Sequence, residues 1–282
     1  MKLCRYGPPG QEKPAIVDQD GQRRDLSGVV PDINGALLAS ASAPLARLDV
    51  RALPLVEAGA RHGAPVAGVG KFICVGLNYR DHAAESNMPL PAEPILFMKA
   101  TSAIMGPNDD VILPPGSLKS DWEVELGVII GREARYVSRE QALNHVAGVC
   151  VVNDLSERHY QLERGGQWDK GKGCDTFGPF GPYLVTLDEA GDLSNLSLWL
   201  EVNGQRMQQG STRELIFDVP FLVHYISQFM SLQPGDIIST GTPAGVGMGK
   251  KPPQFLREGD EIALGIQGLG EQRQRVRRYA GG

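Results

Sequence analysis

Short apolar runs, bounded by glycine and proline, recur along most of the chain. The runs 72–77 (FICVGL), 122–130 (WEVELGVII) and 146–153 (VAGVCVVN) have the length of strands rather than of helices. The run 122–130 alternates polar and apolar residues in its first half and is continuously apolar in its second half. This pattern predicts a strand of which one end emerges from a buried core.

Turn signals predict further strands. Asn203-Gly204 joins the runs 198–202 and 205–208, and Asp20-Gly21 follows the run 15–17. Asn-Gly and Asp-Gly pairs favour the tight turns of hairpins because both residue types tolerate positive φ. Other strands are predicted at 236–240, after a Pro-Gly turn, at 261–266, and at the arginine-rich end of the chain.

Two segments are predicted to be helical. One starts at Ser138, where Gln141 completes a capping box. The other starts at Asp218, with Pro220 just inside it. Its apolar face comprises Phe221, Leu222, Tyr225, Ile226 and Phe229. Because strands do not alternate regularly with helices, we expect a β-rich α+β fold rather than a doubly wound sheet.

The chain has 282 residues, which is enough for one large domain, or for a large domain with a small appendage. We expect a small N-terminal domain over residues 1–70. It contains the first hairpin and a less regular stretch rich in alanine and proline. The main domain is then expected over residues 71–282.

The charge pattern gives no sign of a nucleic-acid partner. The net charge is −5, and the arginines near the C-terminus alternate with other residues as on the solvated face of a strand. No apolar run approaches 18 residues, and the N-terminus has no apolar leader segment. The four cysteines form no C-x-x-C pair. We therefore expect a cytoplasmic protein with no membrane or nucleic-acid partner.

Acidic residues at the ends of two predicted strands are candidate metal ligands. Glu123 and Glu125 point to the same face of their strand, and Asp121 is able to join them. Asp154 directly follows the run 146–153. Buried carboxylates so close together need a compensating cation, and oxygen ligands suit Mg²⁺, Mn²⁺ or Ca²⁺. The alternatives are an exposed edge strand for the glutamates and a turn cap for Asp154.

A second group of residues has the chemistry of proton transfer. If the segment 78–85 is helical, His82 and Glu85 are neighbours one turn apart, and the carboxylate can orient the imidazole as a base. Arg158 and Gln161 have the same spacing after Asp154. A histidine on the surface beside a glutamate is the alternative for the first pair.

Two glycine-rich loops complete the candidates. The segment 168–179 places Lys172 in a polar loop, where it either meets an anionic group or is exposed to solvent. The segment 240–249 (TGTPAGVGMG) follows a predicted strand but matches neither G-x-G-x-x-G nor the Walker A pattern, so a nucleotide site is rejected. Its backbone N–H groups and the Thr242 hydroxyl can still form a nest for a carboxylate.

Five motifs, taken in order, carry a resemblance to a known family. They are G-L-N-Y-x-x-H-x-x-E, E-V-E-L-G-V-I-I-G, N-D-x-S-x-R-x-x-Q, K-G-x-D-T-F-G-P and P-G-D-I-I-x-T-G-T-P-x-G-V-G. Over about residues 71–280 the chain resembles the fumarylacetoacetate hydrolase family. The segment W-D-K-G-K-G-x-D-T-F-G-P-x-G-P is most similar to bacterial 2,4-diketo-3-deoxy-L-rhamnonate and -fuconate hydrolases.

The resemblance implies a mixed β-roll with a small N-terminal α/β domain, assembled as a homodimer. It implies Mg²⁺ or Mn²⁺ held by Glu123, Glu125 and Asp154, with His82 and Glu85 as the water-activating pair on a segment that closes as a lid. The remaining residues that it implies are Lys172 for catalysis, and Arg158, Gln161, Gly241 and Thr242 for binding the pyruvate end of the substrate.

The expected reaction is hydrolysis of a carbon–carbon bond in a 2,4-diketo acid, with a deoxy sugar acid giving pyruvate and lactate. Oxaloacetate decarboxylation, 2-hydroxyhepta-2,4-diene-1,7-dioate isomerisation and ureidoglycolate cleavage use the same chemistry and are alternatives. A non-catalytic protein that binds metal or carboxylate is a further alternative. It would need the three acidic residues but neither His82 nor Lys172.

Overall fold

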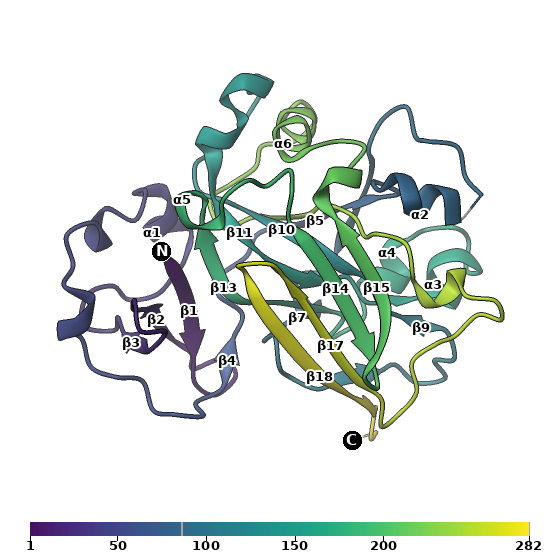
Figure 1. Ribbon diagram of the computed structural model, residues 1–282, viewed down its shortest axis with the longest axis horizontal. Helices are drawn as coiled ribbons and strands as arrows, with labels where there is room; N and C mark the ends of the chain where they lie inside the picture. The colour runs from purple at the N-terminus through teal and green to yellow at the C-terminus, as the bar shows by residue number, and fades with distance from the viewer. Residues whose placement is uncertain (86, 282) are drawn as a thin grey trace.

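The computed structural model describes residues 1–85 and 87–281. A long sheet runs through the molecule, and a second sheet packs against it (Figure 1). The long sheet has the order β3 (Arg23–Asp25), β2 (Lys13–Val17), β1 (Lys2–Tyr6), β13 (Gly178–Thr186), β11 (Val146–Asn153), β10 (Val124–Ile130), β16 (Ile237–Ser239), β5 (Phe72–Gly76) and β6 (Ile95–Lys99). Short strands β4 (His62–Gly63) and β7 (Ile104–Met105) pair with β1 and β13.

The second sheet has the order β15 (Gln205–Ser211), β14 (Ser197–Val202), β17 (Glu261–Ile266), β18 (Gly270–Arg278) and β8 (Val111–Leu113). A two-stranded ladder pairs β9 (Ser120–Asp121) with β12 (Ser156–Glu157). The predicted β-rich α+β class is therefore confirmed.

The helices are short. The α-helices are α1 (Gly35–Ala39), α2 (Arg80–Glu85), α3 (Arg158–Leu162), α4 (Asp169–Lys172), α5 (Leu187–Ala190) and α6 (Val219–Ser227). The 3₁₀ helices are η1 (Ala43–Leu45), η2 (Val50–Ala52), η3 (Thr101–Ala103), η4 (Arg139–His145), η5 (Thr212–Glu214) and η6 (Gly247–Gly249). None of the helices in the described ranges is long and apolar enough to cross a membrane.

The central strands are apolar throughout because both of their faces are covered. On β11, Val149 and Val151 join the core between the two sheets, while Cys150 and Val152 join a second core beneath the N-terminal segment. The predicted run 146–153 matches β11 residue for residue. Strand β10 begins at Val124, so Glu123 stands just before the strand rather than within it.

The N-terminal residues extend the long sheet. Strand β1 pairs with β13 through Lys2 and Leu3, and the predicted first hairpin is formed by β2 and β3 (Figure 1, purple). The division at residue 70 remains a prediction. The hairpin predicted around Asn203-Gly204 is also present, with φ of 52° and 75° at the two turn residues.

The two predicted helices differ from expectation in part. The Ser138 side chain makes no capping hydrogen bond. Its backbone carbonyl accepts from the Gln141 N–H at 3.2 Å, and the segment forms the 3₁₀ helix η4. Asp218 does cap α6, through the Phe221 N–H at 2.9 Å. The predicted apolar face is wrong in part, because Leu222 and Ile226 are buried whereas Phe229 lies beyond the end of α6 and is 63% exposed.

Candidate metal and acid–base site

Three carboxylates meet where strand β10 begins and its neighbour β11 ends. The register pairs Val124 with Asn153, so Glu123 and Asp154 lie side by side at that edge, and the Asp154 N–H donates to the Glu123 carbonyl at 2.9 Å. Glu125 lies two residues along, on the same face of β10. One oxygen from each of the three carboxylates lies within 4.8 Å of the others, and all three side chains are buried.

The three acids have unequal electrostatic environments. Burial raises the pKa of Glu125 well above its usual range, and the negative charges of Asp154 and Glu123 raise it further. Burial also acts to raise the pKa of Glu123, but the cations Lys172 and Arg158 outweigh it and lower that pKa to about 2. Glu125 is therefore the least compensated of the three carboxylates, since the described lysines and arginines pair with Glu123 and Asp154 instead.

Glu125 is held through one oxygen. The Ser239 hydroxyl donates to its Oε2 at 2.5 Å and the Gly241 N–H donates to the same atom at 2.9 Å. Among the described residues, no side chain or backbone group donates to Oε1. The arrangement fixes the carboxylate and leaves one oxygen for another ligand.

Lys172 ends helix α4 and reaches into the cluster. Its ammonium group donates to Glu123 Oε2 at 2.7 Å and to Asp154 Oδ2 at 2.8 Å, and it lies 5.0 Å from the centre of the Phe97 ring. Burial acts to lower the pKa of this lysine, but the two carboxylates outweigh it and raise the pKa. The predicted loop is thus a short helix that buries its lysine against the acids.

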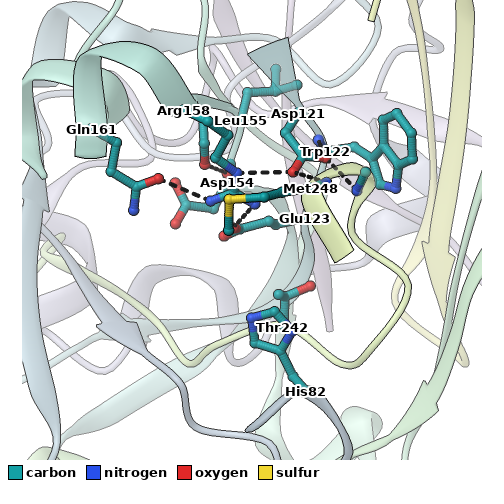
Figure 2. Close-up of polar contacts among 12 residues, drawn as sticks. His82, Asp121, Trp122, Glu123, Asp154, Leu155, Arg158, Gln161, Thr242 and Met248 are labelled. Carbon is teal, nitrogen blue, oxygen red and sulfur yellow. Dashed lines mark hydrogen bonds and ion pairs between the residues drawn. The ribbon is translucent and has the colours of Figure 1, made fainter. Parts of the chain in front are cut away.

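Arg158 begins helix α3 and connects the cluster to its surroundings. Its Nη2 lies 2.7 Å from Glu123 Oε1, and its Nε donates to Asp121 Oδ2 at 2.9 Å. Its Nη1 donates to Gln161 Oε1 at 3.0 Å, so the predicted proximity of Arg158 and Gln161 is confirmed. Figure 2 shows these side chains gathered around Glu123 and Asp154.

Lys99 belongs to the same network and was missed at the sequence level. It ends strand β6, and its Nζ donates to Asp154 Oδ1 at 2.5 Å and to the Leu155 carbonyl at 3.0 Å. A charged residue that terminates an apolar strand is the signal that pointed to Asp154, and the run ILFMK at 95–99 carries the same signal.

His82 and Glu85 lie on helix α2, as the spacing predicts. The imidazole Nδ1 is 3.4 Å from Glu85 Oε2, and Figure 2 shows His82 facing the carboxylate cluster from the opposite side to Arg158. Burial acts to raise the pKa of Glu85, but contacts with His82 and with the Gly245 N–H lower it. The charged carboxylate therefore orients the ring and leaves Nε2 as its free nitrogen.

The glycine-rich segment 240–249 holds carboxylates of this chain itself. The Gly245 N–H donates to Glu85, at 3.0 Å from each of its oxygens. The N–H groups of Gly247 and Met248 donate to Asp121 at 2.6 and 3.0 Å. Asp121 therefore anchors this loop, and the group of acids that could hold a metal comprises the three residues Glu123, Glu125 and Asp154.

Thr242 faces the cavity, but its hydroxyl is used within the protein. It donates to the Val124 carbonyl at 2.9 Å and accepts from Gln208 Nε2 at 2.8 Å. The Gly241 N–H is likewise bound, to Glu125. The predicted contacts of Gly241 and Thr242 with substrate remain predictions.

A cavity of about 530 Å³ connects these groups. Its lining includes all of the predicted site residues except Asp154 and Gly241. These are His82, Glu85, Glu123, Glu125, Arg158, Gln161, Lys172 and Thr242. Apolar walls and a small number of convergent polar groups are typical of small-molecule sites.

Comparison with known proteins identifies the family. Residues 71–277 match the model described as fumarylacetoacetate (FAA) hydrolase C-terminal. A Burkholderia multivorans protein, named as a candidate hydrolase, is 60% identical over 98% of this chain and 99% of its own length. The chain belongs to the fumarylacetoacetate hydrolase family.

Solved structures agree with the family assignment. A fumarylacetoacetate hydrolase from Exiguobacterium antarcticum has a TM-score of 0.88 and 34% identity, covering 99% of this chain and 100% of that one. A maleylpyruvate hydrolase from Sphingobium, in complex with manganese(II) and pyruvate, has a TM-score of 0.83 and 28% identity, covering 99% of both chains. The predicted family fold is therefore confirmed.

The donor set of this family member fits a hard divalent cation. All three candidate ligands are carboxylates, which suit Mg²⁺ or Mn²⁺ rather than a soft metal. In the part of the chain that the structure describes, Glu125 forms no ion pair, whereas Glu123 and Asp154 each pair with two cations. A bound divalent ion would supply the missing positive charge.

Proposed function

We propose that this family member is a metal-dependent hydrolase that splits a 2,4-diketo acid into pyruvate and a carboxylic acid. One observation supports the proposal most strongly. Two carboxylates of the three-carboxylate cluster, Glu123 and Glu125, line one cavity together with a buried lysine, a buried arginine and a histidine oriented by a glutamate. The carboxylates suit a cation that binds a 2-oxo acid, and the histidine oriented by glutamate suits activation of water.

Glu123, Glu125 and Asp154 would hold Mg²⁺ or Mn²⁺. When bound, the ion would supply Lewis-acid stabilisation for the negative charge that develops on the pyruvate unit. Lys172 and Arg158 add fixed positive charge beside it, in a buried environment where such charge is most effective. Gln161 is positioned by Arg158 and presents its amide group to the same cavity.

His82 would act as the general base. Its Nε2 takes a proton from water as the oxygen adds to the C4 carbonyl, while Glu85 stabilises the imidazolium through Nδ1. The C3–C4 bond then breaks, and its electron pair remains on C3 as the enolate of pyruvate. Protonation of C3 completes the balance: one acylpyruvate and one water give one carboxylic acid and one pyruvate.

The identity of the acyl group has a separate basis. The segment 168–182 supports 2,4-diketo-3-deoxy-L-rhamnonate or -fuconate as substrate, giving pyruvate and lactate in sugar catabolism. Decarboxylase, isomerase and ureidoglycolate lyase reactions remain the alternatives on this scaffold. The homodimer and the cytoplasmic location also remain predictions.

Pyruvate release is the test. The protein, loaded with Mn²⁺ and then with Mg²⁺, is incubated with several 2,4-diketo acids, oxaloacetate, a hydroxydiene dioate and ureidoglycolate. Equimolar pyruvate and carboxylic acid from a diketo acid, with no CO₂, supports the hydrolase. Turnover of only one of the alternative substrates contradicts it. Metal binding without any turnover would favour the non-catalytic protein.

A further inference from the structure

A buried glutamine of the second sheet lies next to the candidate site. Gln208 is completely buried, whereas its neighbours on strand β15, Met207 and Gln209, are partly or fully exposed. Its cross-strand partner on β14 is the buried, apolar Leu200. An amide in such a position costs free energy unless its hydrogen bonds are satisfied, so the partners of Gln208 show what it is there to hold.

The amide group of Gln208 closes a ring of three hydrogen bonds. Its Oε1 accepts from the Val124 N–H at 3.0 Å, and its Nε2 donates to the Thr242 hydroxyl at 2.8 Å. That hydroxyl donates in turn to the Val124 carbonyl at 2.9 Å. Nε2 also donates to the Pro243 carbonyl at 2.9 Å. Because Val124 offers an N–H and Pro243 a carbonyl, these partners fix which end of the amide faces each of them.

The ring encloses the residue that separates two proposed metal ligands. Val124 stands between Glu123 and Glu125, and its N–H and carbonyl belong to the two peptide groups that join it to them. On this side of β10, the ladder with β16 begins only at Gly127, opposite Ser239. Side chains therefore replace a neighbouring strand at Val124. Holding both peptide groups fixes the directions in which the two carboxylates leave the backbone.

Strand β15 also supports the glycine-rich loop that follows β16. A Cβ at Gly245 would lie 2.1 Å from the Met207 carbonyl oxygen, and a Cβ at Gly210 would lie 2.5 Å from Pro243 Cβ. Glycine at both positions lets strand and loop approach this closely. Since the Gly245 N–H binds Glu85, the same contact reaches the acid–base pair.

We propose that Gln208 is a positioning residue, which holds Glu123 and Glu125 for the cation and Thr242 for the substrate. It acts through the Val124 peptide groups and the Thr242 hydroxyl rather than by contact with the reacting atoms. The inference rests on the proposed function, because that function supplies the cation and the substrate that the ring would serve.

The experiment opens the ring from each side and measures Mn²⁺ affinity by titration calorimetry. Gln208→Met keeps an unbranched side chain of similar length but removes the amide. We expect it to lose about 10–100-fold in Mn²⁺ affinity, as is usual when a group that orients metal ligands is removed. Thr242→Val should show a similar loss, and Thr242→Ser, which keeps the hydroxyl, should not.

The double variant Gln208→Met/Thr242→Val tests whether the ring acts as a unit. Either single substitution already breaks it, so the double variant should lose no more Mn²⁺ affinity than the weaker-binding single variant. Losses that add would show that the two residues act independently, and would overturn the inference.

Thr212→Val is the control for stability alone. Thr212 directly follows β15, is buried, and its hydroxyl accepts from the Leu196 N–H at 2.8 Å. It lies outside the lining of the candidate cavity. Like Gln208→Met, this substitution leaves a buried backbone N–H without its partner, so the melting temperature should fall in both variants. Mn²⁺ affinity should fall only in Gln208→Met.

The outcomes separate this inference from the hydrolase. Unchanged Mn²⁺ affinity in folded Gln208→Met, or an equal loss in Thr212→Val, would overturn the positioning role. Should Gln208→Met not fold, the comparison of Thr242→Val with Thr242→Ser decides in the same way. Protein that binds Mn²⁺ but releases pyruvate from no diketo acid would refute the hydrolase, while a dependence of Mn²⁺ affinity on Gln208 would stand. Protein that binds no Mn²⁺ would refute both.

Discussion

The ammonium group of Lys99 lies 2.5 Å from Oδ1 of Asp154, and both side chains are completely buried. Lys172 binds the other oxygen of the same carboxylate at 2.8 Å. Lys99 also donates to the Leu155 carbonyl, which ties it to the turn after β11. Lys99 thus holds Asp154 from the side of strand β6, while Lys172 reaches it from helix α4.

Replacing Lys99 with methionine should weaken metal binding. Groups that orient a metal ligand contribute about 10–100-fold to affinity, so we expect a loss of that order for Mn²⁺ in titration calorimetry. Removing one partner of a buried ion pair should also cost about 3–5 kcal/mol of unfolding free energy. Lys99→Arg, which keeps the charge, should recover part of both losses.

Lys71 provides a matched control. Its Nζ pairs with Asp236 at 2.5 Å, and Asp236 is buried, but neither residue lines the candidate cavity. Lys71→Met should therefore lose stability while keeping Mn²⁺ affinity. Equal Mn²⁺ affinity in Lys99→Met and the unmodified protein would show that Lys99 does not position Asp154.

The proposed base and the proposed ligands should separate in their effects. His82→Ala should lose about 10²–10⁴-fold in kcat, the usual contribution of general base catalysis, while Mn²⁺ binding is retained. Glu123→Ala should lose both turnover and Mn²⁺ binding. His145, whose Nδ1 contacts the Glu133 carbonyl at 2.7 Å, offers a control variant, His145→Ala, with normal kcat. Full activity of His82→Ala would reject the assigned base.

Local patterns in the sequence were sufficient for much of the fold and for the three acids. The turn at Asn203-Gly204 and the apolar run ending at Asn153 are decided by nearby residues. Glu123, Glu125 and Asp154 could be predicted because they lie at the adjoining ends of two strands that are adjacent in the sheet. Here, chain order and spatial order agree.

Contacts between distant segments could not be predicted from local sequence patterns. Asp121 meets Gly247 across 126 residues, and Lys99 meets Asp154 across 55. Local periodicity predicts neither contact, since both depend on how whole strands and loops pack. The apolar face of the helix was assigned wrongly in part for the same reason. The helical period identifies apolar positions, but the packing decides that α6 ends at Ser227 and that Phe229, beyond it, is exposed.

The metal-free protein should lose stability as pH rises because of Glu125. The pKa of this buried carboxyl is raised in the folded state. Its contribution to folding stability is therefore fully present below the unfolded-state pKa of about 4.3, and it is lost as pH rises through the folded-state pKa. The loss is about 1.4 kcal/mol for each unit by which the pKa is raised. Urea unfolding in EDTA, at acidic and alkaline pH, measures this dependence.

Glu125→Gln tests the cause of that dependence. The glutamine oxygen can still accept from Ser239 and Gly241, but the residue carries no charge. In EDTA the variant should be as stable as the unmodified protein or more so at alkaline pH, and its stability should depend less on pH. It should also lose Mn²⁺ binding. A variant that is less stable at alkaline pH would show that repulsion among the acids is not the dominant effect.

Asp121→Asn should loosen the loop that carries Met248 and Lys250 to the cavity lining. Each carboxylate oxygen accepts two hydrogen bonds, Oδ1 from Trp122 and Gly247 N–H, and Oδ2 from Met248 N–H and Arg158. In asparagine, one of these two oxygens is replaced by an NH₂ group, which cannot accept the hydrogen bonds of the donors that face it. Arg158 would also lose its charged partner at this position. We expect a loss of about 1–3 kcal/mol in unfolding free energy, as for a buried donor left unpaired.

The catalytic effect should appear mainly in KM, because the loop carries Met248 and Lys250 to the cavity while His82 and Glu125 stay in place. Asp260→Asn is the control, since Asp260 also accepts a backbone N–H in a turn, from Arg257 at 2.7 Å, but lies outside the cavity lining. It should leave KM unchanged. A fall in kcat at constant KM for Asp121→Asn would instead mean that Asp121 acts through Arg158 on the floor of the cavity.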